Sequence, residues 1–352
     1  MAWDFEAASA IFQTHIASQG ENGELVLARQ RFWNLIKPGE TDSEVQLLAQ
    51  AASDIMNYLN QEKWCINLQE FTTVAHENMR RVISPTELTH WREVYADTCI
   101  LRAITQCRNF NLFDAVSTLD HAIIISGTTS RIDIILDIIP AIQSSMEQPL
   151  GQNSQISKIT KPFIQAKSTI PCISPPSFLS FQTVYSRSPF ILRNFAQDWP
   201  ALNNHPWRKA EYLRSIAGPG RMIPVEIGKD YRTDDWKQVI MSWDEFLSTI
   251  DFEDQPASKF SEDTLYLAQH DLTIQFPSLR RDIIIPDYVY ASLSNSEYAN
   301  YRPPANDDNI LFNTWLGPEG TMSPAHNVCY PKYVVFLFAI NALSEPLLGP
   351  LL

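Results

Sequence analysis

The stretch Asn313-Thr314-Trp315-Leu316-Gly317-Pro318-Glu319-Gly320-Thr321-Met322-Ser323-Pro324-Ala325-His326 decides the fold of the second half of the chain. Its first residues complete a predicted strand over 309–316, and the Gly-Pro-Glu-Gly sequence that follows predicts a turn. Further strands are predicted at 189–193, 223–227 and 264–269, and helices at 207–216 and 242–250. Short strands without a strand–helix–strand alternation indicate an antiparallel sandwich or barrel.

Residues 1–147 differ, because their apolar positions recur at three- and four-residue spacings. Ser84-Pro85-Thr86-Glu87 predicts a helix start, since Ser84 can cap, Pro85 suits the first helical position and Glu87 completes a capping box. Pro140 predicts a kink or break in the last helix. These helices should pack in antiparallel pairs as a bundle or short solenoid. The predicted helices cover 8–16, 23–36, 43–60, 84–107, 111–125 and 130–146.

A segment rich in Pro, Ser, Gln and Lys separates these two halves and has no sustained periodicity, which predicts a linker. The expected organisation is an all-α domain over 1–147, a linker over 148–177 and a strand-rich domain over 178–352. The fold class is therefore α+β.

The composition restricts the function classes. Hydrophobic residues make up 45% of the 352 residues and charged residues 19%, which excludes wholesale disorder. The net charge of −13 disfavours direct nucleic-acid binding and suits a basic protein or peptide partner. Five cysteines without a CxxC pair are typical of reduced intracellular thiols. An acidic start and a longest late apolar run of only 333–340 predict neither a signal peptide nor a membrane span, so we expect a nuclear or cytoplasmic protein.

Several segments of the second half, taken together and in order, resemble the Jumonji-C (JmjC) dioxygenases. The resemblance covers roughly 178–326 and extends less clearly to the helical half. It is closest to the subgroup described as arginyl hydroxylases and histone lysine demethylases. It implies a double-stranded β-helix, a cupin-like jelly roll that binds Fe(II) and 2-oxoglutarate. The segments that carry it are 190–193, 198–201, 224–228 with Tyr231 and Trp236, 266–270, 282–288 and 313–326.

The resemblance also assigns candidate site residues. His326 matches the first iron ligand of the family. Tyr266 and Ser323 match hydroxyl positions that contact the carboxylate end of 2-oxoglutarate, and Asn313 and Trp315 match the strand that lines the pocket.

The match departs from the family directly after His326. A facial triad of this type needs His-x-Asp and a later His, but Val328 occupies the carboxylate position and no histidine occurs among residues 327–352. Cys329 and His270 are the other potential ligands, and nothing in the sequence places either beside His326. We therefore expect the jelly roll to be incomplete, with the family match ending near 326, and the iron site to be impaired.

Two functional hypotheses follow. The first is a JmjC-type hydroxylase or demethylase acting on Arg or Lys side chains, with little or no turnover in this chain. The second is a non-catalytic interaction module that binds basic peptides or chromatin proteins through the helical half and an acidic surface. That surface is segment 229–263, which holds ten acidic and four basic residues. A solvated acidic face without a partner remains open as the simpler interpretation.

Overall fold

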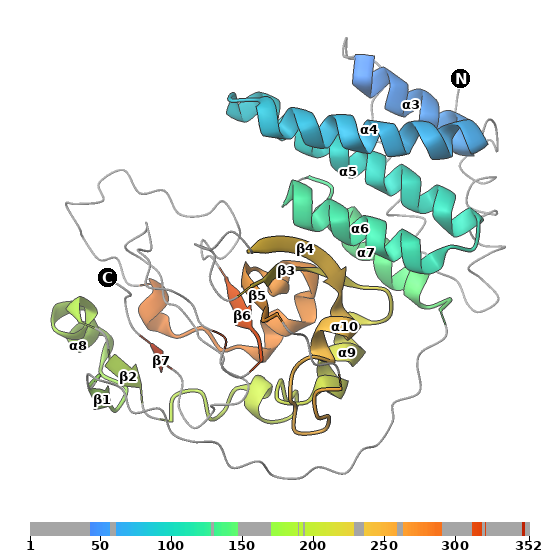
Figure 1. Ribbon diagram of the computed structural model, residues 1–352. Coiled ribbons are helices and arrows are strands. Elements are labelled where there is room, and N and C mark those ends of the chain that lie inside the picture. The colour runs from blue at the N-terminus through green and yellow to red at the C-terminus, as the bar shows by residue number, and fades with distance from the viewer. Residues whose placement is uncertain are drawn as a thin grey trace. The chain divides into compact units, whose positions relative to one another are not determined.

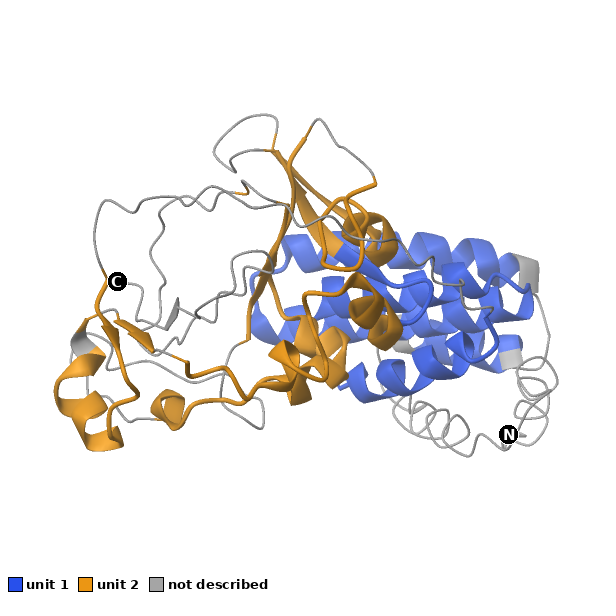
Figure 2. Cartoon of the chain, turned by 90° about the horizontal axis from the view of Figure 1, so that it is seen from below, with its two compact units in different colours: residues 1–150, 218–223 blue, residues 151–217, 224–352 orange. Residues whose placement is uncertain are grey.

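Figure 1 shows the computed structural model of the chain. The structure describes residues 43–56, 61–127, 130–146, 170–188, 190–192, 194–228, 236–258, 263–290, 312–318, 321 and 347–348. The predicted helices at 8–16 and 23–36 and most of the predicted linker lie outside these residues. The chain divides into two compact units, coloured separately in Figure 2. The helical unit comprises 1–150 and 218–223, and the strand-rich unit comprises 151–217 and 224–352.

Five described helices build the helical unit, and α5 packs against α3, α4 and α6 while α7 packs against α6. The α5 start is as predicted, because the Ser84 side chain accepts a hydrogen bond from the Glu87 backbone N–H at 3.5 Å. Pro140 does not break α7, which continues through it and ends three residues later. The helices are α3 Ser43–Met56, α4 Gln61–Arg81, α5 Pro85–Arg108, α6 Leu112–Ser126 and α7 Ile132–Gln143.

Two buried Asp–Arg ion pairs lie in the helical unit. Arg131 donates to both carboxylate oxygens of Asp97, at 2.6 and 3.0 Å. Arg221 makes the same kind of contact with Asp120 on α6. Buried pairs are stable only when the charged atoms are fully hydrogen-bonded, and both pairs meet that requirement with bidentate geometry.

The strand-rich unit contains a four-stranded sheet in the order β4-β3-β5-β6, with β3 and β6 each antiparallel to β5. The first two residues of β3 belong to the helical unit and the remaining four to the strand-rich unit. The strands are β3 Met222–Ile227, β4 Lys237–Ser242, β5 Leu265–His270 and β6 Thr314–Leu316. The predicted strands at 223–227, 264–269 and 309–316 are confirmed within the described residues, whereas β4 was not predicted.

A second sheet has the order β1-β2-β7, in which β1 is parallel and β7 antiparallel to β2. Strand β1 lies inside the segment predicted to be a linker, so its last residues are ordered by pairing with β2. Strand β7 shows that the part of the chain after His326 contributes to a sheet. The strands are β1 Cys172–Ile173, β2 Phe190–Leu192 and β7 Leu347–Leu348.

Short helices accompany these sheets, and buried aromatic side chains in or next to the helices contribute to the core. Trp243 and Phe276 are almost completely buried, with ring centroids 5.5 Å apart. The helices are α8 Phe178–Thr183, α9 Ala210–Ala217, α10 Trp243–Leu247 and α11 Leu272–Gln275, and the 3-10 helices are η1 Tyr185–Arg187, η2 Pro200–Leu202, η3 Pro277–Asp282 and η4 Asp287–Tyr290. The helices of the first half of the chain are followed by the strands of the second half, and this order confirms the predicted α+β class.

Candidate functional site

The candidate site is centred on Tyr266 of β5, one of the residues predicted from the sequence. Tyr266 pairs directly with Glu226 of β3 across the antiparallel ladder, and both side chains are half-buried. Burial, and secondarily the charge of Glu226, raises the pKa of Tyr266 from 10.0 to about 12. The phenol therefore keeps its proton at neutral pH and can donate a hydrogen bond to a carboxylate.

Trp236, just before β4, completes the surroundings of Glu226. Its indole Nε1 donates to Glu226 Oε2 at 3.3 Å. Among the residues that the structure describes, no cation forms an ion pair with Glu226. A carboxylate that accepts from an indole and pairs across the ladder with a tyrosine is a suitable receptor for a cationic side chain, because it offers a charge partner near aromatic side chains.

Strand β6 brings two more predicted residues next to β5. Asn313 and Trp315 flank Thr314, which pairs with His270. The register shifts between Leu267 and His270, and Gln269 in this bulge has φ 53°. The Asn313 amide nitrogen, in the orientation that satisfies its neighbours, donates to the Gln269 carbonyl at 3.2 Å. Asn313 thus holds the bulge, while contact of Asn313 or Trp315 with a cofactor stays a prediction.

The turn after β6 packs against the Tyr266 ring. A β-carbon on Gly317 would lie 3.0 Å from Tyr266 Cδ2 and 2.6 Å from Thr321 Oγ1. Thr321 in turn donates to the Pro318 carbonyl at 2.7 Å and closes the turn. A side chain at 317 would therefore force Thr321 or Tyr266 to move, and the turn restricts the position of the phenol.

The predicted iron ligand stands in a part of the chain outside the described residues. Ser323, His326 and Val328 lie outside the described residues, but Val328 has no donor atom to offer a cation. Within the described ranges, no group of three His, Cys, Asp or Glu side chains is arranged to hold a metal. The incomplete donor set of the iron site therefore stays a prediction from the sequence.

His270, considered as a substitute ligand, has a structural contact instead. Its Nε2 is 2.8 Å from Gln275 Oε1. The neighbouring carboxylate, Asp271, caps α11 by accepting hydrogen bonds from the backbone N–H and hydroxyl of Thr273. Burial raises the pKa of Asp271. Both side chains maintain the end of β5.

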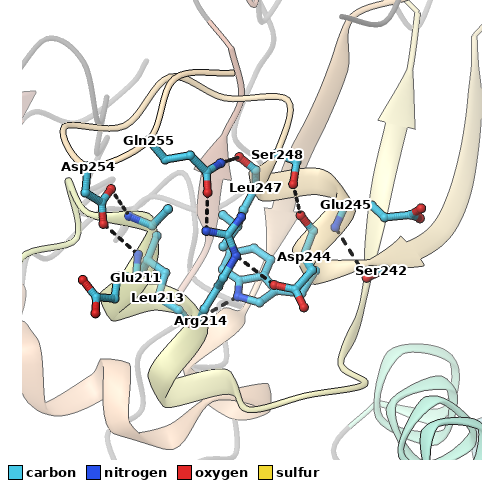
Figure 3. A network of polar contacts seen from close by, with 12 residues as sticks. Glu211, Leu213, Arg214, Ser242, Asp244, Glu245, Leu247, Ser248, Asp254 and Gln255 are labelled. Carbon is cyan, nitrogen blue, oxygen red and sulfur yellow. Dashed lines mark hydrogen bonds and ion pairs between the residues drawn. The ribbon is translucent and has the colours of Figure 1, made fainter. Parts of the chain in front are cut away.

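Several acids of segment 229–263 also have structural contacts (Figure 3). Asp254 accepts from the backbone N–H groups of Ala210 and Glu211 at 2.8 and 2.9 Å, which caps the first turn of α9. Arg214 donates to Asp244 at 2.9 Å. Asp244 and Asp254 thus have partners within the fold that offset their charge. Glu226, in contrast, has no ion pair among the described residues.

Sequence reasoning missed the roles of Glu226 and Trp236, although both lie in segments that resemble the family. The available signal was a single acid in the otherwise apolar strand Ile223-Pro224-Val225-Glu226-Ile227. Buried or half-buried acids in strands are uncommon without a partner, so such an acid marks a candidate site.

None of the described helices is both long enough and apolar enough to cross a membrane.

Comparison with known proteins supports the resemblance to the JmjC dioxygenases that the sequence predicts. The family model for a cupin-like domain matches residues 175–333. A Drosophila melanogaster protein named Jumonji C domain-containing protein 5 is 40% identical over 180 residues, 51% of this chain and 40% of the relative. Lysine-specific demethylase 8 of Danio rerio is 28% identical over 254 residues, 67% of this chain and 58% of the relative.

A plant relative extends the comparison. Lysine-specific demethylase JMJ30 of Arabidopsis thaliana is 27% identical over 270 residues, 67% of this chain and 58% of the relative. The chain therefore spans between 40% and 58% of the length of these three relatives. The cupin-like match and these relatives together support the assignment of the chain to the JmjC family.

Proposed function

We propose that this chain recognises Arg side chains of basic proteins at Glu226, and that its hydroxylase or demethylase turnover is weak or absent. The observation that carries the proposal is the Glu226 carboxylate, with Tyr266 opposite it and the Trp236 indole hydrogen-bonded to it. The Glu226 carboxylate thus provides one negative charge next to two aromatic residues. Because Glu226 is half-buried, its attraction to a cation is screened less by water than that of an exposed acid.

Arg fits this arrangement better than Lys. A planar guanidinium can pair with a carboxylate through two parallel N–H···O bonds and can stack on an aromatic ring. A Lys ammonium is a compact point charge that uses neither feature. Lys remains the alternative, since three of the curated relatives of this chain are named lysine-specific demethylases.

The second part of the proposal, weak or absent turnover, concerns the residues that would bind 2-oxoglutarate and Fe(II). JmjC family members generally depend on Fe(II) and 2-oxoglutarate. In this chain Tyr266 supplies a protonated hydroxyl for the carboxylate of 2-oxoglutarate, and Ser323 is the second proposed contact. His326 is the proposed iron ligand, but Val328 removes the carboxylate that should share the metal. Iron affinity should fall accordingly, because such sites combine several preorganised ligands.

Peptide affinity tests the recognition half of the proposal. The full chain is titrated with three peptides that are identical except for one residue, which is Arg, Lys or citrulline. Citrulline keeps the shape of Arg and lacks its charge. We expect the Arg peptide to bind at least about tenfold more tightly than the citrulline peptide, corresponding to about 1.4 kcal/mol. Equal affinities would refute recognition by charge, and tighter binding of the Lys peptide would reassign the substrate class.

Succinate formation tests the catalytic half. The chain is incubated with Fe(II), 2-oxoglutarate and the Arg peptide, beside a His326→Ala variant. We expect the same background rate from both proteins. Turnover that His326→Ala abolishes would show that the site is active despite Val328.

A second candidate function is a non-catalytic interaction module for basic peptides or chromatin proteins, in the nucleus or the cytoplasm. Binding of the Arg peptide without succinate formation would favour it. The internal contacts of Asp244 and Asp254 favour Glu226 over the acidic segment as the place where such a partner binds.

A further inference from the structure

The chain returns to the helical unit for six residues, the last two of which begin the strand that carries Glu226. Residues 218–223 belong to the helical unit, whereas the rest of β3 belongs to the strand-rich unit (Figure 2). Arg221 stands immediately before β3, and Glu226 is four residues after Met222, the first residue of the strand. Whatever fixes the start of β3 therefore also affects Glu226.

Asp120 of α6 fixes that start through an unusually complete set of hydrogen bonds. It accepts from Arg221 Nε at 2.9 Å and Nη2 at 2.8 Å, and from the backbone N–H of Met222 at 2.7 Å. The Arg221 side chain is 6% exposed and that of Asp120 is 0% exposed. Replacing such a deeply buried pair by apolar residues is often neutral for stability, whereas removing one partner leaves an unpaired buried charge. The bidentate contact also fixes the positions of both residues.

Two glycines and one glutamine hold the same segment from α6 and α7. Gly220, at φ 80°, lies so close to α6 that a β-carbon would be 3.3 Å from Val116 Cβ. A β-carbon on Gly218, at φ 70°, would meet the Gln143 side chain at 2.6 Å. Gln143 Nε2 also donates to the Pro219 carbonyl at 2.8 Å. The segment is thus held at several consecutive residues, which leaves it little freedom to slide.

Position along β3 matters because strand side chains alternate between faces. Ile223 and Val225 are fully buried, while Met222, Pro224 and Glu226 are partly exposed. A slip by one residue would exchange these two sets and turn the Glu226 carboxylate away from its face. The contact between Asp120 and the Met222 N–H selects one register, since that N–H must meet a fixed carboxylate.

We propose that Asp120 and Arg221 are positioning residues for Glu226, and that the helical unit sets the register of the strand that recognises the basic side chain. The ligand part of this proposal rests on the proposed function above. The helical unit then has a role in the site although it supplies no side chain to it.

The chain contains a matched control for this proposal. Asp97 and Arg131 form a second buried bidentate pair in the helical unit, with both side chains 8% exposed. That pair has no described contact with β3. Asp97→Asn and Asp120→Asn therefore make the same chemical change in similarly buried pairs, and they differ in whether the start of β3 is released.

The test compares hydrogen exchange in the two variants of the full chain. Asp120→Asn should speed exchange at least tenfold in β3, in β5 and at the adjoining Gly228 N–H, which donates to the Thr264 carbonyl, whereas Asp97→Asn should not. Asp120→Asn should also weaken Arg-peptide binding about tenfold. Equal exchange of β3 in both variants would overturn the proposal. If the wild-type chain does not bind the Arg peptide, the proposed function fails, and exchange still decides the positioning role.

A milder variant covers the case in which Asp120→Asn does not fold. Gln143→Ala removes the hydrogen bond to Pro219 without leaving a buried charge unpaired. We expect it to speed exchange in β3 by twofold to fivefold and to leave exchange in α5 unchanged. An unchanged β3 in Gln143→Ala, together with an unfolded Asp120→Asn, would also overturn the proposal.

Discussion

Glu226 and Tyr266 stand directly opposite each other across the antiparallel strands β3 and β5. The negative charge of Glu226 opposes ionisation of the phenol, in the same direction as burial. The pair consequently presents one acceptor of positive charge and one hydrogen-bond donor on neighbouring strands. These are the two functions needed to bind a basic side chain and a carboxylate close together.

The first prediction concerns the ionisation of Tyr266. The difference in tyrosinate absorbance between the wild-type chain and Tyr266→Phe should show a midpoint near pH 12, well above the ordinary value of 10.0. In a Glu226→Gln background the midpoint should move down, because one of the two causes of the shift is removed. A midpoint near 10 in the wild type would show that Tyr266 is neither buried nor close to that charge.

The same shift has a consequence for stability. A folded pKa above the unfolded value means that the folded state holds the proton more tightly, so the stabilisation is complete below pH 10 and is lost between pH 10 and about 12. Urea denaturation across this range should show a steeper loss of stability for the wild type than for Tyr266→Phe. Parallel curves for the two proteins would contradict this.

Trp236 should contribute to recognition through its N–H group. Trp236→Phe keeps an aromatic ring but removes the hydrogen bond to Glu226. One such bond is worth about 1 kcal/mol net, so the Arg-peptide affinity should fall about fivefold. Trp91→Phe in α5 is the control and should leave affinity unchanged. An affinity loss of the same size in both variants would indicate a general effect on the protein.

Gly317 should be intolerant of even one added methyl group. In Gly317→Ala the new β-carbon meets Tyr266 and Thr321 at distances that the neighbours must relieve by moving. Overpacking of this kind costs about 1–3 kcal/mol, which urea denaturation can measure. The tyrosinate midpoint of Tyr266 should shift in the same variant. Wild-type stability with an unshifted midpoint would mean that the turn does not restrict the phenol.

Asp282 should be a main determinant of stability in the strand-rich unit. This carboxylate is 1% exposed and accepts from His205 Nδ1 at 2.6 Å, Trp207 Nε1 at 2.8 Å and the Tyr212 hydroxyl at 2.6 Å. Asp282→Asn has one acceptor oxygen instead of two and should lower the free energy of unfolding by about 2–4 kcal/mol.

Asp251→Asn provides the comparison for Asp282. Within the part of the chain that the structure describes, Asp251 accepts one hydrogen bond, from the Ala257 N–H, and the amide oxygen of Asn can replace it. Its free energy of unfolding should stay within about 0.5 kcal/mol of the wild-type value. Similar losses of stability in both variants would show that the three hydrogen bonds of Asp282 do not make it a main determinant of stability.

Local signals in the sequence were sufficient for several elements. The Ser84 cap predicts the start of α5, and Gly218 follows directly after the last residue of α9. No helix is predicted over 61–81, yet α4 forms there although Thr72, Thr73 and Val74 are a β-branched run, which disfavours a helix. In the structure Thr72 Oγ1 donates to the Leu68 carbonyl at 2.7 Å, so its polar group is satisfied within the helix.

The site itself could be predicted only in part. Tyr266, Asn313 and Trp315 were identified by resemblance, and the pairing of β5 with β6 brings their strands together. The contact between Trp236 and Glu226 depends on the packing of segments whose register no local pattern specifies. The same holds for Asp120 and Arg221, which are 101 residues apart in the chain.

The affinity of the full chain for the Arg peptide, measured for the wild type, Glu226→Gln and Glu245→Gln, tests the central claim most directly. Glu245 is an exposed acid on α10, so its variant makes the same loss of charge away from the site. We predict that Glu226→Gln lowers the affinity at least about tenfold, while Glu245→Gln changes it less than about twofold, as expected for an exposed charge. Equal affinities for wild type and Glu226→Gln would contradict recognition at this carboxylate.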